Sequence, residues 1–335
     1  MQISTKYAES NVNIGETSCI PVMPTRIVPD MQDDVCESLL NRPRSLSPKY
    51  FYDERGSELF DQICSTPEYY PTRTENTLLT EYAVEIIDKT RPEQILELGS
   101  GYSVKTRRLF DACQHISHSC TYAPFDVCEE ALVESAQKLS KEYQWLDLKP
   151  LLGDYHGGLG NLPATQGSHL YLFLGSTIGN FEQHEALAFI NELYDVMREG
   201  DHFLIGIDRV KKNDVLHAAY NDAQGITAEF NLNVLHVLNR ELNANFDINA
   251  FTHSATFNTE KERIEMRLTS IRKQEVKIND LEKTIHFDKD ESILTEISQK
   301  YTYSGIEEML TDAGFSITDH YEDDNQYFSL VLASK

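Results

Sequence analysis

A glycine turn and one acidic residue are the features of this sequence most able to bind a nucleoside. The stretch QILELGSG (94–101) is typical of an apolar strand that ends in a glycine turn, and CTYAPFDV (120–127) of a second strand that ends near Asp126. A glycine turn lets a ligand approach the backbone and leaves amide groups free at the start of the next helix. A carboxylate after the second strand can accept hydrogen bonds from both hydroxyls of a ribose. The two segments therefore predict a site for a ligand that contains a nucleoside.

The spacing of the glycines separates two classes of nucleoside ligand. A dinucleotide site needs the pattern G-x-G-x-x-G, and Val104 occupies the position of the third glycine. This disfavours a nicotinamide oxidoreductase. The dipeptide GD at 153–154 and an expected antiparallel hairpin at the C-terminus favour a site for S-adenosylmethionine (SAM), which has no pyrophosphate. We therefore expect a methyltransferase.

A second turn places an amide side chain after another apolar strand. In YLFLGSTIGNFEQHEAL (171–187), Asn180 lies between the strand and a helical pattern. Open α/β sheets bind ligands at the carboxyl ends of their strands, and an amide can donate to a carboxylate or accept from an amine. Taken alone, the Gly-Asn dipeptide is better explained as an ordinary turn. The assignment of Asn180 to a site depends on the rest of the chain.

Strands that alternate with helices indicate a parallel sheet covered on both faces. Besides the two strands above, we expect strands at 148–155, 169–176 and 201–210. Beyond residue 211 the pattern changes to helices and antiparallel strands, and near 304 the α/β pattern returns. The predicted fold is a Rossmann-like class I methyltransferase domain with an inserted α+β domain for the substrate. The expected boundaries are a flexible N-terminus over 1–20, a SAM-binding domain over 74–210 and 301–335, and a substrate-binding domain over 21–73 and 211–300.

Composition limits the partners of the protein. With 30 Lys and Arg against 54 Asp and Glu among 335 residues, the formal net charge is −24, which repels nucleic acid and anionic membranes. No apolar run approaches the ~18 residues that a membrane span requires. The six cysteines form no CxxC pair, and the histidines show no metal-ligand spacing. We expect a cytoplasmic monomer that binds a small molecule and no metal.

The motifs as a set resemble one enzyme family. SPKYFYDERGSELFDQICSTPEYYPTRTE (47–75), FLGSTIGN (173–180), AYNDAQGITAEFN (219–231), RIEMRL (263–268) and TEIS (295–298) are similar, in the same order, to motifs of the SAM-dependent histidine Nα-methyltransferases of ergothioneine biosynthesis. The resemblance covers about residues 40–335. It implies a Rossmann-like domain with an inserted substrate-binding domain. It also implies an enzyme that transfers three methyl groups from SAM to the α-nitrogen of L-histidine and so forms hercynine.

The resemblance also implies which residues form the site. The amino and carboxylate groups of the substrate are expected among Tyr52, Tyr69, Asn180, Tyr220 and Thr227. The imidazole is expected against Glu296 and Ser298, with Met266 beside the ring. SAM is expected across Gly99, Ser100, Gly101, Lys105, Asp126, Gly153, Asp154, Tyr155 and Gly175.

Methyl transfer requires a neutral amine, whereas a free amino acid is mostly an ammonium ion near neutral pH. We take Tyr52 as the catalytic residue that orients the amine and passes on its proton, because a phenol can both donate and accept.

Other functions are compatible with parts of the sequence. A related enzyme could methylate tryptophan or tyrosine, but Glu296 and Met266 favour histidine because a carboxylate can accept from an imidazole N–H. A scaffold that binds SAM without catalysis would not need the substrate residues. Taken singly, Glu296 is better explained as a solvated charge on a strand. Met266 is also compatible with the inward face of a strand, and the tyrosines at 69 and 70 are as well explained by core packing.

Overall fold

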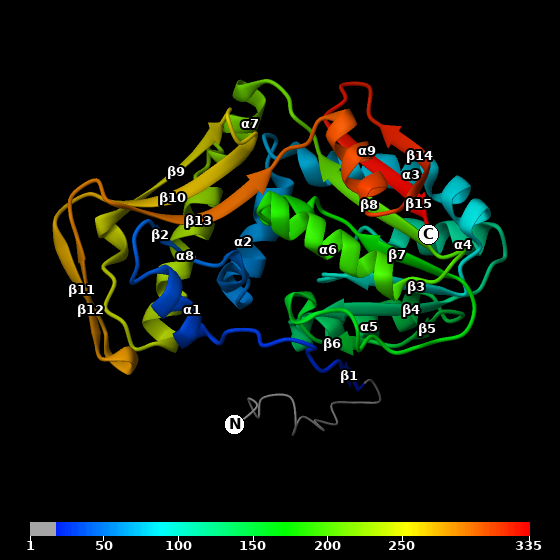
Figure 1. The fold of residues 1–335 in the computed structure, drawn as a ribbon, viewed down its shortest axis with the longest axis horizontal. Helices are drawn as coiled ribbons and strands as arrows, with labels where there is room; N and C mark the ends of the chain where they lie inside the picture. Colours follow the sequence, from blue (N-terminus) through cyan, green and yellow to red (C-terminus); the bar gives the residue numbers. More distant parts are fainter. Residues whose placement is uncertain (1–17) are drawn as a thin grey trace.

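The computed structural model of the protein describes residues 18–335. The expected flexible N-terminus over 1–20 lies almost wholly outside the described residues. Figure 1 shows two β-sheets side by side, a large sheet on the right and a smaller one on the left. Among the described residues, no helix combines the length and apolar character that crossing a bilayer requires.

The large sheet has the strand order expected for a Rossmann-like methyltransferase. Its strands follow the order β1 (Ile20–Pro21), β6 (Leu151–Leu152), β4 (Thr121–Asp126), β3 (Gln94–Leu98), β7 (His169–Phe173), β8 (His202–Asp208), β15 (Phe328–Ser334) and β14 (Ser316–Glu322). The pairs from β1 to β8 are parallel, whereas β15 is antiparallel to both β8 and β14. The predicted fold class is confirmed, including the C-terminal hairpin.

Helices cover both faces of this sheet, because its strands carry apolar side chains on both sides. On β7, Leu170 and Leu172 belong to one core and Tyr171 and Phe173 to the other, as the two-residue period of a strand requires. The first core contains α3 (Tyr70–Thr90) and α4 (Arg107–His115), together with Leu139 of α5 (Glu129–Glu142). The second contains α6 (Gln183–Val196), in front of the sheet in Figure 1, and α9 (Tyr303–Asp312).

The second sheet belongs to a separate apolar core. It follows the order β2 (Arg44–Ser45), β13 (Ser292–Gln299), β10 (Arg263–Ser270) and β9 (Phe251–Asn258), and β11 (Gln274–Ile278) pairs with β12 (Lys283–Phe287) as a hairpin. Its helices are α1 (Met31–Ser38), α2 (Glu54–Ser65), α7 (Asn213–Tyr220) and α8 (Ile226–Glu241). The buried residues of this core come from 35–70 and 216–293. The domain boundaries given above stay a prediction.

Three local features differ from the sequence expectations. Strand β1 pairs with β6 in the large sheet, although residue 21 was assigned to the substrate-binding domain. The strand expected over 148–155 is two short strands, β5 (Asp147–Leu148) and β6, because Pro150 between them has no N–H to donate. The helical stretch after residue 213 is interrupted between α7 and α8, where Gly225 has a φ of 75°.

Candidate active site

The predicted SAM turn is held in shape by Asp126. The backbone N–H of Gly101 donates to Asp126 Oδ2 at 2.8 Å, and that of Cys128 donates to Oδ1 at 3.0 Å. Gly99 and Gly101 both have positive φ, 69° and 49°, which a residue with a Cβ adopts only with strain. Burial raises the pKa of Asp126 despite these hydrogen bonds. Each carboxylate oxygen accepts one backbone hydrogen bond and keeps a lone pair for a further donor.

The space around this turn fits a nucleoside. A Cβ built on Gly101 would meet no atom within 4 Å, so the backbone is open to a ligand there. The Ser100 hydroxyl is buried and has no hydrogen-bond partner within residues 18–335. Val104 and Val127, which follow the turn and Asp126, are 65% and 54% exposed. An adenosine would cover apolar side chains and supply a partner for the orphan hydroxyl.

The Gly153–Asp154–Tyr155 turn meets the glycine turn through Tyr155. The N–H of Gly153 donates to the carbonyl of Asp126 at 3.0 Å, and a Cβ built on Gly99 would lie 3.6 Å from Tyr155 Cε1. Asp154 accepts from the backbone N–H of His156 at 2.8 Å, and its Oδ1 lies 3.0 Å from His156 Nδ1. Burial opposes ionisation, but these contacts outweigh it and lower the pKa of Asp154.

A buried carboxylate that the sequence analysis did not single out joins Lys105 to Gly175. Glu75 of α3 is fully buried, accepts from the Gly175 N–H at 2.7 Å and forms an ion pair with the Lys105 ammonium. Gly175 has a φ of 78° at the end of β7. Glu75 therefore places a cation beside the strand end where the SAM turn and the predicted amino-acid site meet.

Aromatic rings form one wall of the predicted substrate site. The ring of Phe60 lies 5.7 Å from that of Tyr52 and 6.2 Å from that of Tyr69, and the Tyr69 ring lies 6.1 Å from that of Tyr220. Phe230 of α8 packs edge-on against Tyr52 at 5.7 Å. Three predicted tyrosines therefore come together on a surface completed by two phenylalanines that the sequence analysis did not assign.

Tyr52 is partly exposed to solvent although protein surrounds it. It is 41% exposed, yet desolvation by surrounding protein is the largest cause of a pKa raised well above the usual tyrosine value. The charge of Glu296 and the neighbouring Tyr155 raise the pKa further. Tyr155 belongs to the predicted SAM site and Glu296 to the predicted imidazole site, so Tyr52 lies between the two.

Glu296 and Met266 are opposite each other on adjacent antiparallel strands. Residue 266 of β10 pairs with residue 296 of β13, and the register shifts directly after Met266. Directly opposed side chains share a face of the sheet. Burial raises the pKa of Glu296 to about 7, although Lys300 opposes the shift. Within the described residues the Glu296 carboxylate makes no hydrogen bond, so it is free to accept one from a ligand.

The Asn180 turn packs against the strand that carries Glu296. Asn180 ends the short helix η4 (Thr177–Asn180), and a Cβ built on Gly179 would lie 2.9 Å from the carbonyl oxygen of Gln299 and 3.4 Å from Ser298 Oγ. The structure thus brings Asn180 close to β13. Thr227 is buried in α8, where its N–H donates to Asp222 at 2.7 Å. No hydrogen bond among the described residues joins Thr227 to the other predicted side chains.

A buried charge cluster supports the predicted substrate residues. Lys300 Nζ lies 2.8 Å from Asp208 Oδ2 and donates to Tyr220 Oη at 2.9 Å and to Ser298 Oγ at 2.7 Å. Asp208 also accepts from Tyr70 Oη at 2.8 Å and pairs with Lys211. Burial and the nearby Lys300 outweigh the pull of Asp208 and lower the pKa of Lys211 to about 8. Apart from Asp208 at the end of an apolar strand, no local sequence pattern indicates this cluster.

Comparison with known proteins identifies the family. A family model described as "Histidine-specific methyltransferase, SAM-dependent" matches residues 31–335. The chain belongs to this family. The histidine N-alpha-methyltransferase of Mycobacterium tuberculosis is 42% identical over 305 residues, which cover 91% of this chain and 95% of that protein. That of Mycolicibacterium smegmatis is 42% identical over 303 residues, covering 90% and 94%. Ergothioneine biosynthesis protein 1 of Neurospora crassa is 35% identical over 201 residues, covering 59% of this chain and 23% of that protein.

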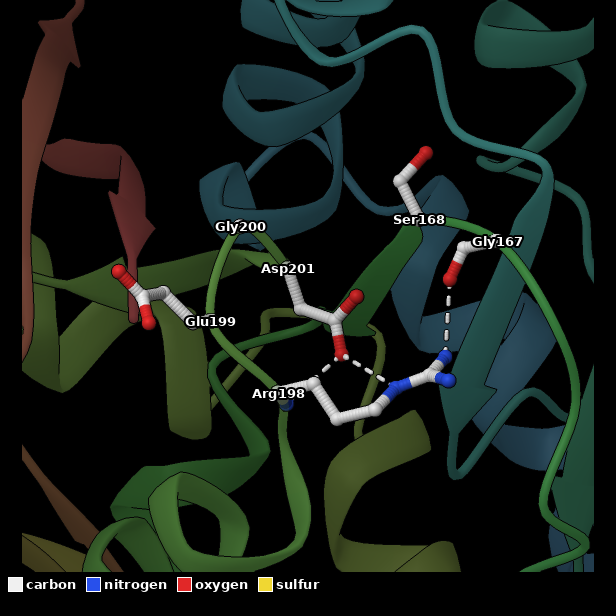
Figure 2. Close-up of a pocket in the computed structure, with 6 residues that line it drawn as sticks. All are labelled: Gly167, Ser168, Arg198, Glu199, Gly200 and Asp201. Carbon is white, nitrogen blue, oxygen red and sulfur yellow. Dashed lines mark hydrogen bonds and ion pairs between the residues drawn. The ribbon is translucent and has the colours of Figure 1, made fainter.

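A hollow on the surface of this histidine-specific methyltransferase lies away from the candidate site. It has a volume of about 270 Å³ and is lined by residues 167–168 and 198–201, before β7 and β8 begin. Figure 2 shows Arg198 donating to the carbonyl of Gly167 at 2.8 Å and reaching Asp201. The candidate site is at the opposite, carboxyl ends of the strands, where open α/β sheets bind ligands. The hollow lies at a turn in which Arg198 pairs with Asp201.

Proposed function

We infer that this enzyme transfers three methyl groups from SAM to the α-nitrogen of L-histidine, forms hercynine, and supplies a step of ergothioneine biosynthesis. Membership of the histidine-specific family and the identity to histidine N-alpha-methyltransferases over nearly the whole chain support this function. The observation that carries it is the Glu296 carboxylate. Glu296 is paired with Met266 on the adjacent strand, and its carboxylate has no hydrogen-bond partner within the described residues. An imidazole N–H would supply that partner.

SAM supplies an electrophilic methyl group on a sulfonium centre. We propose that the glycine turn, Asp126 and the Gly153–Asp154–Tyr155 turn hold its nucleoside part. We assign the pair of Glu75 and Lys105 beside Gly175 to the amino-acid part of SAM, because a lysine can bind a carboxylate there.

We propose that Tyr52 orients the substrate amine as a neutral phenol. Because its pKa is raised, the phenolate form is scarce near neutral pH and Tyr52 is a poor general base on its own. As a phenol it can still accept one amine hydrogen bond and donate another through water. Holding the amine lone pair towards the methyl carbon is the main contribution that positioning can make to such a displacement.

The aromatic wall suits a head group that grows with each methylation. Every transfer removes an N–H donor and adds an apolar methyl group. The rings of Tyr52, Tyr69 and Phe60 present faces and edges that tolerate methyl groups and attract alkylated ammonium. We propose that this wall retains the mono- and dimethylated intermediates while Asn180 binds the α-carboxylate.

The alternative substrates, tryptophan and tyrosine, are less well supported. An indole N–H or a phenol O–H would sit differently from the imidazole N–H that histidine offers to Glu296, and either ring would require more room beside Met266. Sites built to hydrogen-bond a ligand group can reject analogues that lack it by ~10⁴-fold or more.

Mass spectrometry tests the proposed function directly. The purified protein is incubated with SAM and each of the twenty amino acids in turn. Histidine alone should gain one, two and then three methyl groups, with fragmentation locating them on the α-nitrogen. Methylation on the imidazole, or faster methylation of another amino acid, would overturn the proposal.

A further inference from the structure

Lys300 uses all of its hydrogen-bonding capacity inside the protein. Its side chain is fully buried, and its ammonium lies within 2.9 Å of Asp208 Oδ2, Tyr220 Oη and Ser298 Oγ. An ammonium group has three donors and no acceptor. Burial alone would lower the pKa of Lys300, but Asp208 outweighs burial and the pKa is raised, so the group is charged. Each of the three oxygens must therefore act as an acceptor towards Lys300.

This contact determines which way the Ser298 hydroxyl points. Tyr220 Oη also donates to Ser298 Oγ at 2.9 Å, as expected because a phenol is a stronger acid than an aliphatic alcohol. Ser298 Oγ then accepts from Lys300 and from Tyr220, which fills both of its lone pairs. Among the described residues Ser298 Oγ accepts both of its hydrogen bonds and donates none, so its own proton is available to a ligand. If the hydroxyl pair is reversed, the spare proton belongs to Tyr220, and the pair still offers one donor.

The predicted imidazole site therefore presents one acceptor and one donor. Glu296 and Ser298 are two residues apart on β13, and Glu296 accepts while Ser298 donates. A neutral imidazole matches this pair with one N–H and one unprotonated nitrogen, whereas an imidazolium has two N–H groups. Building on the function proposed above, we propose that Lys300 is a positioning residue that fixes Ser298 as a donor, so that the site selects the neutral imidazole ring in one tautomer.

A protonated ring is opposed in two ways. Its second N–H would face the Ser298 hydroxyl proton and lose a buried hydrogen bond. Its positive charge would also lie near the buried ammonium of Lys300. The ion pair with Asp208 keeps Lys300 in position, because Asp208 is itself bound by Tyr70 and Lys211. Without Lys300, Ser298 could rotate and accept from either form of the ring.

Several other groups around the ring site can titrate or carry charge. They are Glu296 on β13, Asp208 at the end of β8, Lys211 in the following loop, Tyr220 on α7, His253 on β9, and Tyr52, Tyr69 and Tyr70 near the start of α2 and α3. The tyrosines have raised pKa values, and burial lowers the pKa of His253. Glu296, with a pKa of about 7, and Lys211, with a pKa of about 8, are therefore the groups that titrate close to neutrality. A test by pH must cancel the effect of both.

A ligand pair achieves this cancellation. The dissociation constants of histidine and of its 1,2,4-triazole analogue are measured by calorimetry with S-adenosylhomocysteine present. The triazole keeps an N–H and an unprotonated nitrogen but is a far weaker base, so it stays neutral. Titration of Glu296 and of Lys211 affects both ligands alike. In the wild-type protein, the dissociation constant of histidine divided by that of the triazole should rise about tenfold for each pH unit below the imidazole pKa of ~6.5.

Variants then assign this pH dependence to Lys300. Lys300→Met and Ser298→Ala should each weaken histidine binding about tenfold at pH 8 and flatten the rise of the ratio at low pH. Lys300→Arg, which keeps charge and donors, should restore part of the slope. Lys211→Met is the matched control, because it removes another buried lysine from Asp208 without touching Ser298, and it should keep the wild-type slope. Thermal unfolding and affinity for S-adenosylhomocysteine report on folding.

Two results would overturn the proposal: a wild-type ratio that does not change with pH, or a wild-type slope in Lys300→Met. If Lys300→Met does not fold, the proposal is tested by the pH dependence of the ratio in the wild-type protein and in Ser298→Ala. A wild-type slope in Ser298→Ala would then overturn it. Failure of the enzyme to methylate histidine would contradict the proposed function, whereas the binding ratio would still report on Lys300.

Discussion

Asp126 has two roles at the scale of a single residue. It shapes the glycine turn through the N–H of Gly101, and we assign its remaining lone pairs to the ribose of SAM. Asp126→Asn keeps the size of the side chain and removes its charge. Loss of charge-assisted hydrogen bonds should weaken binding of S-adenosylhomocysteine by roughly 1.5–3 kcal/mol. Calorimetry measures this, with the affinity for histidine as the internal control. An unchanged affinity for S-adenosylhomocysteine would remove Asp126 from the SAM site.

Glu296 should make the ligand-free protein less stable as pH rises. Burial raises its pKa from 4.5 to about 7, so between these values the folded protein holds a proton that the unfolded chain has released. Stability therefore falls across this window, and the full cost is present above pH 7. Glu296→Gln should raise the free energy of unfolding at pH 8 by about 1–3 kcal/mol. The gain should shrink towards pH 5, as measured by denaturant titration; a gain that does not depend on pH would contradict the shift.

The individual site residues differ in how far the sequence could predict them. Asp126 and the glycine turn at 99–101 lie at the ends of apolar strands, so local pattern is enough to find them. Asn180 also follows a strand, but its assignment to a site depends on the other motifs of the chain. Glu75, Phe60 and Lys300 are single residues within ordinary helical or strand patterns. Their role depends on contacts such as that between Lys300 and Tyr220, which are 80 positions apart. Only the fold brings such residues together.

At the scale of elements, the η4 helix and strand β13 form a close contact between the two sheets. Gly179 allows close approach, because a Cβ there would lie 2.9 Å from the Gln299 carbonyl oxygen and 3.2 Å from its nitrogen. Gly179→Ala must push the turn away from β13, and with it Asn180. We expect the Michaelis constant for histidine to rise at least tenfold while affinity for S-adenosylhomocysteine stays within twofold, since positioning errors of ~1 Å can cost ~100-fold. Gly160→Ala is a control outside the site, because Gly160 does not have a positive φ. Wild-type kinetics in Gly179→Ala would contradict this role of the contact between η4 and β13.

The elements themselves were largely predictable, and the exceptions have physical causes. Strands that carry apolar residues on both faces, such as β3 and β7, indicate buried strands of a parallel sheet. The two-residue strands β1, β5 and β6 are too short to give a pattern. Strand β1 exists because residues after the undescribed start of the chain reach the edge of the large sheet, where the N–H of Ile20 donates to the carbonyl of Pro150 at 2.8 Å. Such edge pairing carries no local sequence signal.

At the scale of the whole molecule, the proposed histidine site takes residues from both sheets. Asn180 follows a strand of the large sheet, whereas Tyr52, Tyr220 and Glu296 belong to segments around the second core. The proposed SAM site takes its residues mainly from turns of the large sheet. Binding of a ligand suppresses the local opening of every segment that it contacts. Histidine should therefore couple the two sheets, and S-adenosylhomocysteine alone should not.

Hydrogen exchange measures this coupling segment by segment. S-adenosylhomocysteine alone should slow exchange in 99–103 and 153–157 and leave β10 and β13 unchanged. Adding histidine should slow exchange in η4 and in β13 together, because a ligand between them must restrain both sides. Asn180→Ala removes the large-sheet contact, and it should keep the histidine-dependent protection of β13 at saturating ligand while losing most of that of η4. Protection confined to β13 in the wild type would place the amino acid wholly within the second sheet and contradict the shared site, as would protection that S-adenosylhomocysteine alone produces in β13.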